Sequence, residues 1–227
     1  MFTEVYLWRN KGCLSIPMDV DPLTIYKQFH TPHNLQIHML RVASVAVIIL
    51  DKWTGPKIDR SAIIQTCLFH DIAKPVTFDM SKQGRFVESI QELEALQKHH
   101  DNLIKQFGTD EHHAVLAIFK TIGLSENAQR LINNLEWSYA DKLREDGDIE
   151  SLVPIYSDMR VEPEGIATIE ERMKDISTRY DINLEKRLQS ALKVELVIKQ
   201  NTNQDVDTIT ASDIYNKIIE FAPLYKQ

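Results

Sequence analysis

The chain has 227 residues, of which 43% are hydrophobic and 26% are charged, and its formal net charge is −7. This length allows one large domain with a substantial core, and the composition is typical of a soluble globular protein. The negative charge disfavours nonspecific binding to long nucleic acids and anionic membranes. It permits a small phosphorylated substrate where a metal reverses the local potential. Cys13 and Cys67 provide no disulfide framework, which fits a reducing cytoplasm.

Apolar residues three and four positions apart, together with capping and breaking residues, predict a chain made of helices. In chain order we expect helices at 34–51, 59–73, 88–106, twice within 107–137, and at 149–161, 167–180, 183–200 and 210–224. Residues 76–89 contain polar turn residues and Gly84, so a loop is expected there. Because no convincing pattern of alternating strands is present, the predicted class is all-α.

Three helix starts carry candidate capping residues. Asp59 or Ser61 is expected to cap the second helix, and Thr109 or Asp110 the first helix of the 107–137 segment. Ser125, with a glutamate next to it, is expected to start the helix that follows.

The most apolar run, residues 42–50, lies within the first predicted helix. A membrane span needs about 20 residues, and this run is much shorter, so we expect a buried helix rather than a span. Residues 1–13 carry Glu4 and no long apolar stretch, so no secretory signal is predicted. These observations favour a cytoplasmic protein without a membrane partner.

Four polar side chains interrupt apolar faces of the predicted helices: His38, the adjacent His70 and Asp71, and Asp158. Each is costly to bury alone. If the helices pack side by side, one divalent metal satisfies all four, because imidazole and carboxylate suit iron, manganese, zinc or nickel. Such a set also leaves coordination positions open for water. Taken singly, each has an ordinary interpretation, since core histidines usually bond a backbone carbonyl and Asp158 can cap a helix or pair with Arg160.

A second adjacent pair, His100 and Asp101, shows that the dipeptide alone is not diagnostic. This pair follows His99 in a stretch that is polar all round. We therefore expect His99 and His100 on the surface.

The segments NLQIHMLRVASVA, CLFHDIAKP and IYSDMRV, the last followed by IEERMKDISTRY, carry the four polar residues in order. Together they resemble the HD superfamily of metal-dependent phosphohydrolases, over roughly residues 33–180, with Ala73 where glycine is common. The resemblance implies an HD-domain-like multi-helix bundle around a site in which His38, His70, Asp71 and Asp158 bind the metal. It also implies hydrolysis of a phosphate ester, with Asp71 among the catalytic residues.

Further site residues are expected around this set. Lys74, one turn after His70, is a candidate catalytic and phosphate-binding residue, and Arg41 and Arg85 are candidates for substrate binding; each has a solvated or ion-paired side chain as its alternative. Relatives of this family carry a further histidine in the region of GTDEHHAVLAIF. His112 is the candidate for that catalytic role, and His113 is the close alternative and a candidate substrate contact.

Relatives also carry a histidine before the last aspartate, and residues 130–145 contain none. Asn134 or Glu136 can occupy that position. We therefore expect one divalent metal ion rather than two, with manganese, iron, nickel, cobalt, magnesium and zinc all open. Asp141 in the segment YADKLRE is a rival to Asp158 as the last ligand.

The expected organisation is an N-terminal extension at 1–32 that packs on the core, an HD-type helical domain at 33–180, and C-terminal helices at 181–227. The last part belongs to the same domain or forms an oligomer surface, which allows a homodimer. The leading function is a metal-dependent phosphohydrolase acting on a small phosphate ester, such as a nucleotide or related phosphometabolite. The alternatives are a non-catalytic HD-fold module that binds a nucleotide or a partner protein, and a helical interaction domain without metal.

Overall fold

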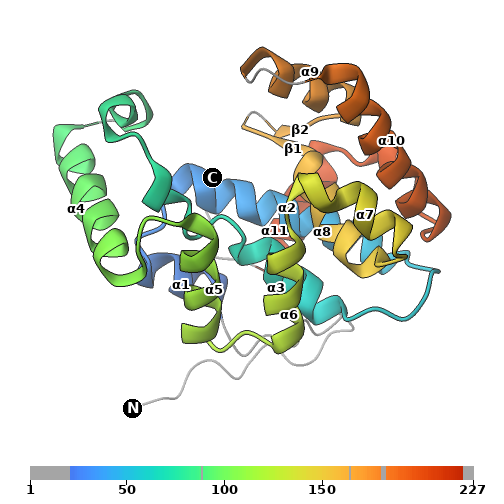
Figure 1. Ribbon diagram of the computed structural model, residues 1–227, viewed down its shortest axis with the longest axis horizontal. Coiled ribbons are helices and arrows are strands. Elements are labelled where there is room, and N and C mark those ends of the chain that lie inside the picture. The colour runs from blue at the N-terminus through green and yellow to red at the C-terminus, as the bar shows by residue number, and fades with distance from the viewer. Residues whose placement is uncertain (1–20, 88, 164, 180–182, 222–227) are drawn as a thin grey trace.

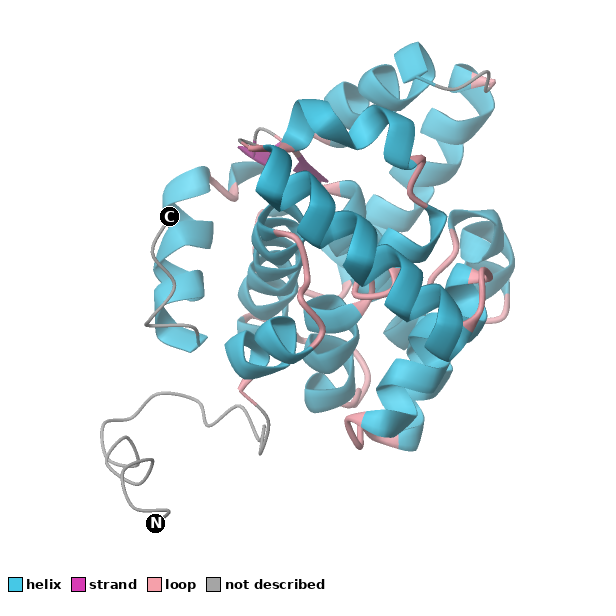
Figure 2. Cartoon of the chain, turned by 90° about the vertical axis from the view of Figure 1, so that its left-hand side faces the viewer, coloured by secondary structure: helices cyan, strands magenta, loops and turns pink. Residues whose placement is uncertain are grey.

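The computed structural model describes residues 21–87, 89–163, 165–179 and 183–221. These residues are predominantly helical (Figure 1, Figure 2), which confirms the predicted all-α class. The α-helices are α1 (Pro22–Gln28), α2 (His33–Asp51), α3 (Arg60–Phe69), α4 (Ile90–Phe107), α5 (Glu111–Thr121), α6 (Glu126–Asn134), α7 (Ala140–Glu145), α8 (Ile149–Met159), α9 (Ile169–Arg179), α10 (Leu184–Gln200) and α11 (Ala211–Phe221). Short 3₁₀ helices are η1 (Lys74–Thr77), η2 (Met80–Phe86), η3 (Trp137–Tyr139) and η4 (Val206–Thr208).

The helices begin at side chains that satisfy their first backbone N–H groups. Asp59, rather than Ser61, caps α3 by accepting a hydrogen bond from the N–H of Ala62 at 3.0 Å. Asp110, rather than Thr109, caps α5. Ser125 caps α6 as expected.

Three local predictions need correction. The second helix ends at Phe69 instead of residue 73, because Pro75 has no N–H and the chain tightens into bonds three residues apart, such as Lys74 N–H to Asp71 O at 3.0 Å. The expected loop at 76–89 contains the end of η1 and all of η2. A hairpin of two-residue strands, β1 (Val161–Glu162) and β2 (Gly165–Ile166), occurs where no strand was expected.

Helix α2 lies at the centre of the core and packs against α3, α8 and α11. Its side chains Met39, Leu40 and Ile49 are fully buried. By length and composition alone α2 could span a membrane, with a mean hydropathy of 1.4, and 56% of that window is buried inside the fold. The core helix of a soluble protein has these same properties, which agrees with the expected buried helix.

The ends of the described chain pack on this core. Tyr26 of α1 is buried and donates its hydroxyl to the carbonyl of Leu68 at 2.6 Å. At the other end α11 lies against α2 through buried residues such as Ile214 and Ile218. Residues 1–20 and 222–227 lie outside the described residues, and the proposed boundaries at 32 and 180 stay predictions.

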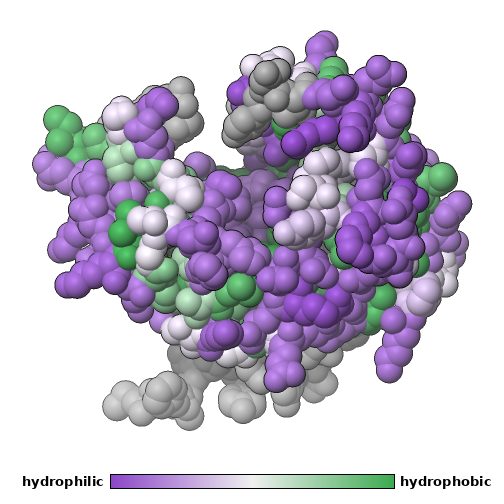
Figure 3. Space-filling model, in the orientation of Figure 1, coloured by the Kyte–Doolittle hydropathy of each residue, from purple (hydrophilic) through white to green (hydrophobic). Residues whose placement is uncertain are grey.

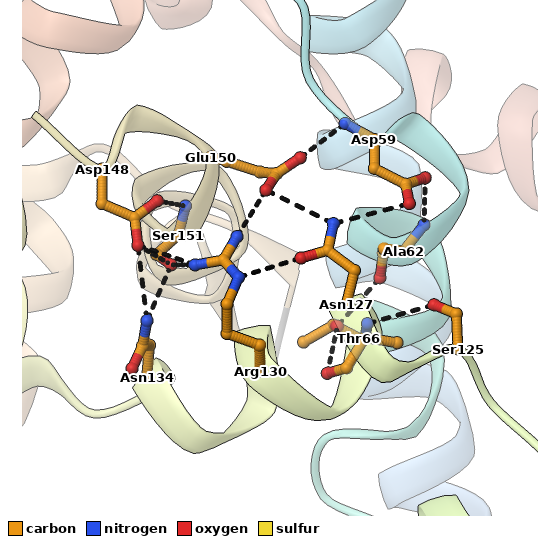
Figure 4. Close-up of polar contacts among 11 residues, drawn as sticks. Asp59, Ala62, Thr66, Ser125, Asn127, Arg130, Asn134, Asp148, Glu150 and Ser151 are labelled. Atoms are coloured by element: carbon orange, nitrogen blue, oxygen red, sulfur yellow. Dashed lines mark hydrogen bonds and ion pairs between the residues drawn. The ribbon is translucent and has the colours of Figure 1, made fainter.

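A polar network ties together α6 and the starts of α3 and α8 (Figure 4). Arg130 donates to Asn127 Oδ1 at 2.9 Å and to Asp148 Oδ2 at 2.8 Å, and it also pairs with Glu150. Asn127 donates to Asp59 Oδ2 at 3.4 Å. The network therefore holds the N-terminal ends of α3 and α8. His70 and Asp71 directly follow the C-terminal end of α3, and Asp158 lies in the last turn of α8.

Asn134 belongs to this same network. Its amide donates to Ser151 Oγ at 3.1 Å and to Asp148 Oδ2 at 3.4 Å (Figure 4). It had been a candidate for the position of the missing histidine, and the structure gives it this packing role between α6 and α8.

The molecule is hollowed on one side (Figure 3). One side of the hollow is formed by α4 and η2, and the other by α9 and the hairpin (Figure 1). The candidate site lies on the side of α9.

Candidate metal centre

Four side chains converge from three places in the fold. His38 comes from α2, His70 and Asp71 from the turn after α3, and Asp158 from the last turn of α8. His38 Nε2 lies 3.0 Å from Asp158 Oδ1, 3.3 Å from His70 Nε2 and 3.8 Å from Asp71 Oδ2. His70 Nε2 lies 3.5 Å from Asp158 Oδ1 and 4.0 Å from Asp71 Oδ2. The packing of the helices thus brings together the four residues expected from the sequence.

These separations fit a bound divalent ion. Metal–nitrogen and metal–oxygen bonds of roughly 2.0–2.2 Å at tetrahedral or octahedral angles place neighbouring donor atoms about 3.0–3.5 Å apart. The donor atoms of His38, His70 and Asp71 all lie within 4.8 Å of one another, and Asp158 lies within 3.5 Å of both histidines. A small inward adjustment of Asp71 would complete the set.

The other nitrogen of His70 is held by the backbone. His70 Nδ1 lies 2.9 Å from the carbonyl oxygen of Cys67, so Nδ1 carries the proton and donates it. This contact leaves Nε2 facing the cluster, as in metal-binding histidines whose second nitrogen is fixed by an outer-shell acceptor. The ordinary core-histidine bond and a metal role therefore involve different nitrogens of the same ring.

The electrostatics of the cluster favour a cation. Burial opposes protonation of His70, but the Asp71 and Asp158 carboxylates outweigh it and raise the pKa of His70 to about 9. Burial likewise disfavours the Asp158 carboxylate, yet hydrogen bonds with His38 and His70 hold its pKa well below its usual value. Without a metal, the two carboxylates stabilise a proton on His70. A divalent ion bound between the same side chains would replace the charge of this proton.

The cluster opens into a cavity of about 890 Å³. Small-molecule sites in proteins have volumes of roughly 300–1,000 Å³. His38, Asp71 and Asp158 line the cavity together with Arg41 and Lys74. The cavity is therefore large enough for a nucleotide-sized ligand and places basic side chains beside the cluster.

Comparison with family models gives a match between residues 35–143 and the HD domain. The chain contains an HD domain. Neither a curated protein nor a solved structure matches it. The match confirms the resemblance found in the sequence, and HD domains are in general metal-dependent hydrolases that bind divalent metals. Within the HD domain match lie His38, His70 and Asp71, whereas Asp158 lies beyond it.

Two of the candidate substrate contacts, Arg41 and Lys74, line the cavity. Arg41 Nη1 donates to the carbonyl of Pro163 at 2.9 Å, which ties α2 to the hairpin. Lys74 Nζ lies 3.2 Å from Glu111 Oε1. Burial lowers the pKa of Lys74, but Asp71, Glu111 and Asp158 raise it by more, so the ammonium stays protonated beside the cluster.

Glu111 was not singled out in the sequence. It begins α5, directly before the two histidines that were, and it accepts from both Lys74 and Thr77. Its position as the acidic first-turn residue of a capped helix is the one local signal that pointed to it, and that signal does not reveal its partner.

His112 and His113 lie elsewhere. His112 is exposed, with Nε2 3.0 Å from Asn133 Oδ1, and the His113 side chain is 80% exposed with Nδ1 3.5 Å from Asp110. Neither lines the cavity of the HD domain. Both occupy the first turn of α5, whose buried face begins one residue later at Ala114, so the catalytic role expected for His112 and the substrate contact expected for His113 have no geometric support.

Arg85 lies in η2, and its side chain is outside the described part.

The structure also separates the two candidates for the last ligand. Asp141 lies in α7 with 48% of its side chain exposed, 3.8 Å from Arg144, and it does not line the cavity. Asp158 contacts both histidines.

Arg160 does not pair with Asp158. It is buried and donates to the carbonyls of Ala167 and Val206 and to the hydroxyl of Tyr156.

In the second His-Asp pair Asp101 is exposed, whereas His100, expected at the surface, is partly buried with 15% of its side chain exposed. His100 Nδ1 lies 3.1 Å from Asp101 Oδ1, and this aspartate also accepts from Gln97. The expectation for His99 was wrong, because this side chain is buried against the ring of His30 at 5.6 Å between centroids. Burial, then the neighbours His30 and His100, lower the pKa of His99 to about 4.

Proposed function

We propose that this HD-domain chain is a metal-dependent phosphohydrolase that acts on a small phosphate ester such as a nucleotide. The observation that carries the proposal is the convergence of His38, His70, Asp71 and Asp158 beside a cavity lined by Arg41 and Lys74. A cluster of metal donors next to cationic side chains is the arrangement that hydrolysis of a phosphate ester requires.

Each part has a distinct task in this reaction. When bound, a divalent metal supplies an activated water and polarises the phosphoryl oxygen. The protonated Lys74 and the Arg41 guanidinium bind and orient the phosphate and stabilise charge that develops on its oxygens. Asp71 and Asp158 supply the negative charge that holds the ion, and the Cys67 carbonyl fixes the orientation of the His70 ring.

The donor set fits one metal, and the same four residues are the ones that the sequence predicted for it. The net charge of −7 favours a small substrate over a long nucleic acid. A cytoplasmic location, the lack of a membrane partner and a homodimer remain predictions that follow from the sequence alone.

The second candidate is a non-catalytic HD-fold module that binds a nucleotide or a partner protein. It is favoured by one observation: apart from His38, no histidine lines the cavity within the described residues. A hydrolase of this kind must therefore rely on the metal site and on the lysine and carboxylates around it for proton transfer.

The test is metal analysis followed by phosphate release from a panel of nucleotides and sugar phosphates, after loading with manganese or nickel. His70→Ala is the test variant, and His100→Ala is its matched control. His100 also precedes an aspartate, but it belongs to no group of candidate metal ligands among the described residues. We expect about one metal per chain, with metal and hydrolysis lost in His70→Ala and kept in His100→Ala. Metal without hydrolysis of any ester would favour the binding module, and absence of metal after loading would contradict both.

A further inference from the structure

Three arginines on the C-terminal helices line the far side of the cavity. Arg172 and Arg179 belong to α9, and Arg187 to the first turn of α10. All three lie beyond residues 35–143, the segment matched by the HD domain. We call these three residues the arginine wall.

Two members of the arginine wall have carboxylate partners, and the third, Arg187, is exposed. Arg172 Nη1 lies 3.1 Å from Asp175 Oδ2, and Arg179 contacts this same oxygen. Glu162 of the hairpin also interacts electrostatically with both guanidinium groups. No ion pair involves Arg187 within the described residues, where its side chain is exposed at the rim of the cavity.

Two polar atoms in this region lack partners. Arg172 Nε is buried without a hydrogen-bond acceptor among the described residues, and so is Glu162 Oε1 without a donor. Both residues line the cavity. A phosphate oxygen can accept a hydrogen bond from Arg172 Nε, whereas the Glu162 oxygen needs a donor such as water.

The arginine wall is separate from the basic residues next to the metal centre. Lys74 interacts electrostatically with Asp71 and Asp158 of the metal centre. Arg172 and Arg179 instead interact electrostatically with Glu162 of the hairpin. A phosphate at the metal centre would be neutralised by the metal, Lys74 and Arg41. That phosphate would leave the arginine wall without a ligand.

We propose that the arginine wall binds a second phosphate group of the substrate, so that the preferred substrates carry at least two phosphate groups. The inference rests on the proposed function, because it places the first phosphate at the metal centre. Guanidinium groups suit this task since their planar donors bind phosphate oxygens in pairs. The cavity of about 890 Å³ accommodates a ligand that reaches from the centre to the wall.

The test compares the binding of orthophosphate and tripolyphosphate to the nickel-loaded protein by calorimetry, with metal content checked afterwards. The test variant is Arg187→Gln, which removes one charge of the wall without breaking an ion pair among the described residues. Lys186→Gln is the matched control, because Lys186 is the exposed neighbour that does not line the cavity. A second variant, Arg172→Gln, probes the buried part of the wall.

We expect wild-type protein to bind tripolyphosphate at least about tenfold more tightly than orthophosphate. Arg187→Gln should reduce this preference several-fold, while Lys186→Gln keeps the preference. Chelation of the nickel by tripolyphosphate cannot imitate this result, because it would be the same in both variants. Equal affinities in the wild type, or equal losses in Arg187→Gln and Lys186→Gln, would overturn the inference.

The same protein preparations separate this inference from the proposed function. Hydrolysis of simple phosphate monoesters without a tripolyphosphate preference would leave the hydrolase standing and remove the second phosphate site. An arginine-dependent preference without hydrolysis of any ester would support the wall and point to the binding module.

Discussion

The segment matched by the HD domain and the segment that follows it build different parts of the site. Residues 35–143 supply His38, His70 and Asp71, which lie on the central helix and at the end of its neighbour. The following segment supplies Asp158 and the arginine wall. The matched part therefore carries most of the metal chemistry, while the later part completes the donor set and shapes the far side of the cavity.

This difference shows that a site can depend on residues outside the recognisable domain. Asp158 reaches the histidines because α8 packs against both α2 and α3. Arg160, which directly follows α8, connects the end of this helix to Ala167, just after β2, and to Val206 of η4 through their backbone carbonyls. Removing contacts of the later segment tests how strongly the matched segment depends on it.

The largest expected effect comes from Asp158→Asn. The amide keeps the size of the side chain but removes the charge that attracts the ion, so metal affinity should fall by more than about 100-fold, since even outer-shell partners contribute about 10–100-fold. Metal titration measures this change. Asp141→Asn is the control and should bind metal as the wild type does. If Asp158→Asn bound metal normally, the matched segment would form the centre without help.

The next effect concerns stability, through Arg160→Met. The variant leaves the carbonyls of Ala167 and Val206 and the Tyr156 hydroxyl without their buried donor. We expect a loss of about 3 kcal/mol in the free energy of unfolding, measured in urea. Lys193→Met, at an exposed position of α10, should stay within about 0.5 kcal/mol of the wild type. Equal stability of the two variants would show that Arg160 does not hold the later segment in place.

The smallest expected effect is the pH dependence of stability that comes from His99, a residue of the segment matched by the HD domain. Its pKa in the folded protein is about 4, below the ordinary value of 6.5. The unfolded chain therefore binds a proton first as pH falls, so stability is full above about pH 6.5 and is lost towards pH 4. From pH 7 to pH 5 this residue should account for a decrease of about 1–2 kcal/mol.

His99→Phe should remove this part of the pH dependence in urea unfolding, whereas His113→Gln, at an exposed position, should keep it. His30 and His100 face His99 and remain in both variants. An unchanged pH dependence in His99→Phe would mean that the burial of this histidine has no energetic consequence.

Much of the fold could be predicted because helix formation depends on neighbours in sequence. The spacing of apolar residues along 34–51 and a cap at Asp59 or Ser61 follow from local geometry, and the structure confirms the helix and shows Asp59 as the cap. The short hairpin after α8 could not be predicted, since strands of two residues leave no alternating pattern. The end of α3 at Phe69 was missed because the tight bonds before Pro75 replace a helical turn without changing the hydrophobic pattern.

By itself, the sequence determined the helical class, the family resemblance and the polar residues that interrupt apolar faces. Only the tertiary structure decided that Asp158 rather than Asp141 contacts the histidines, that His112 lies away from the cavity, that His99 is buried, and that Glu111 pairs with Lys74. The reason is physical: a periodic pattern fixes which face of a helix is buried. The contacts across that face depend on which helices pack together and at what depth each side chain enters the shared space.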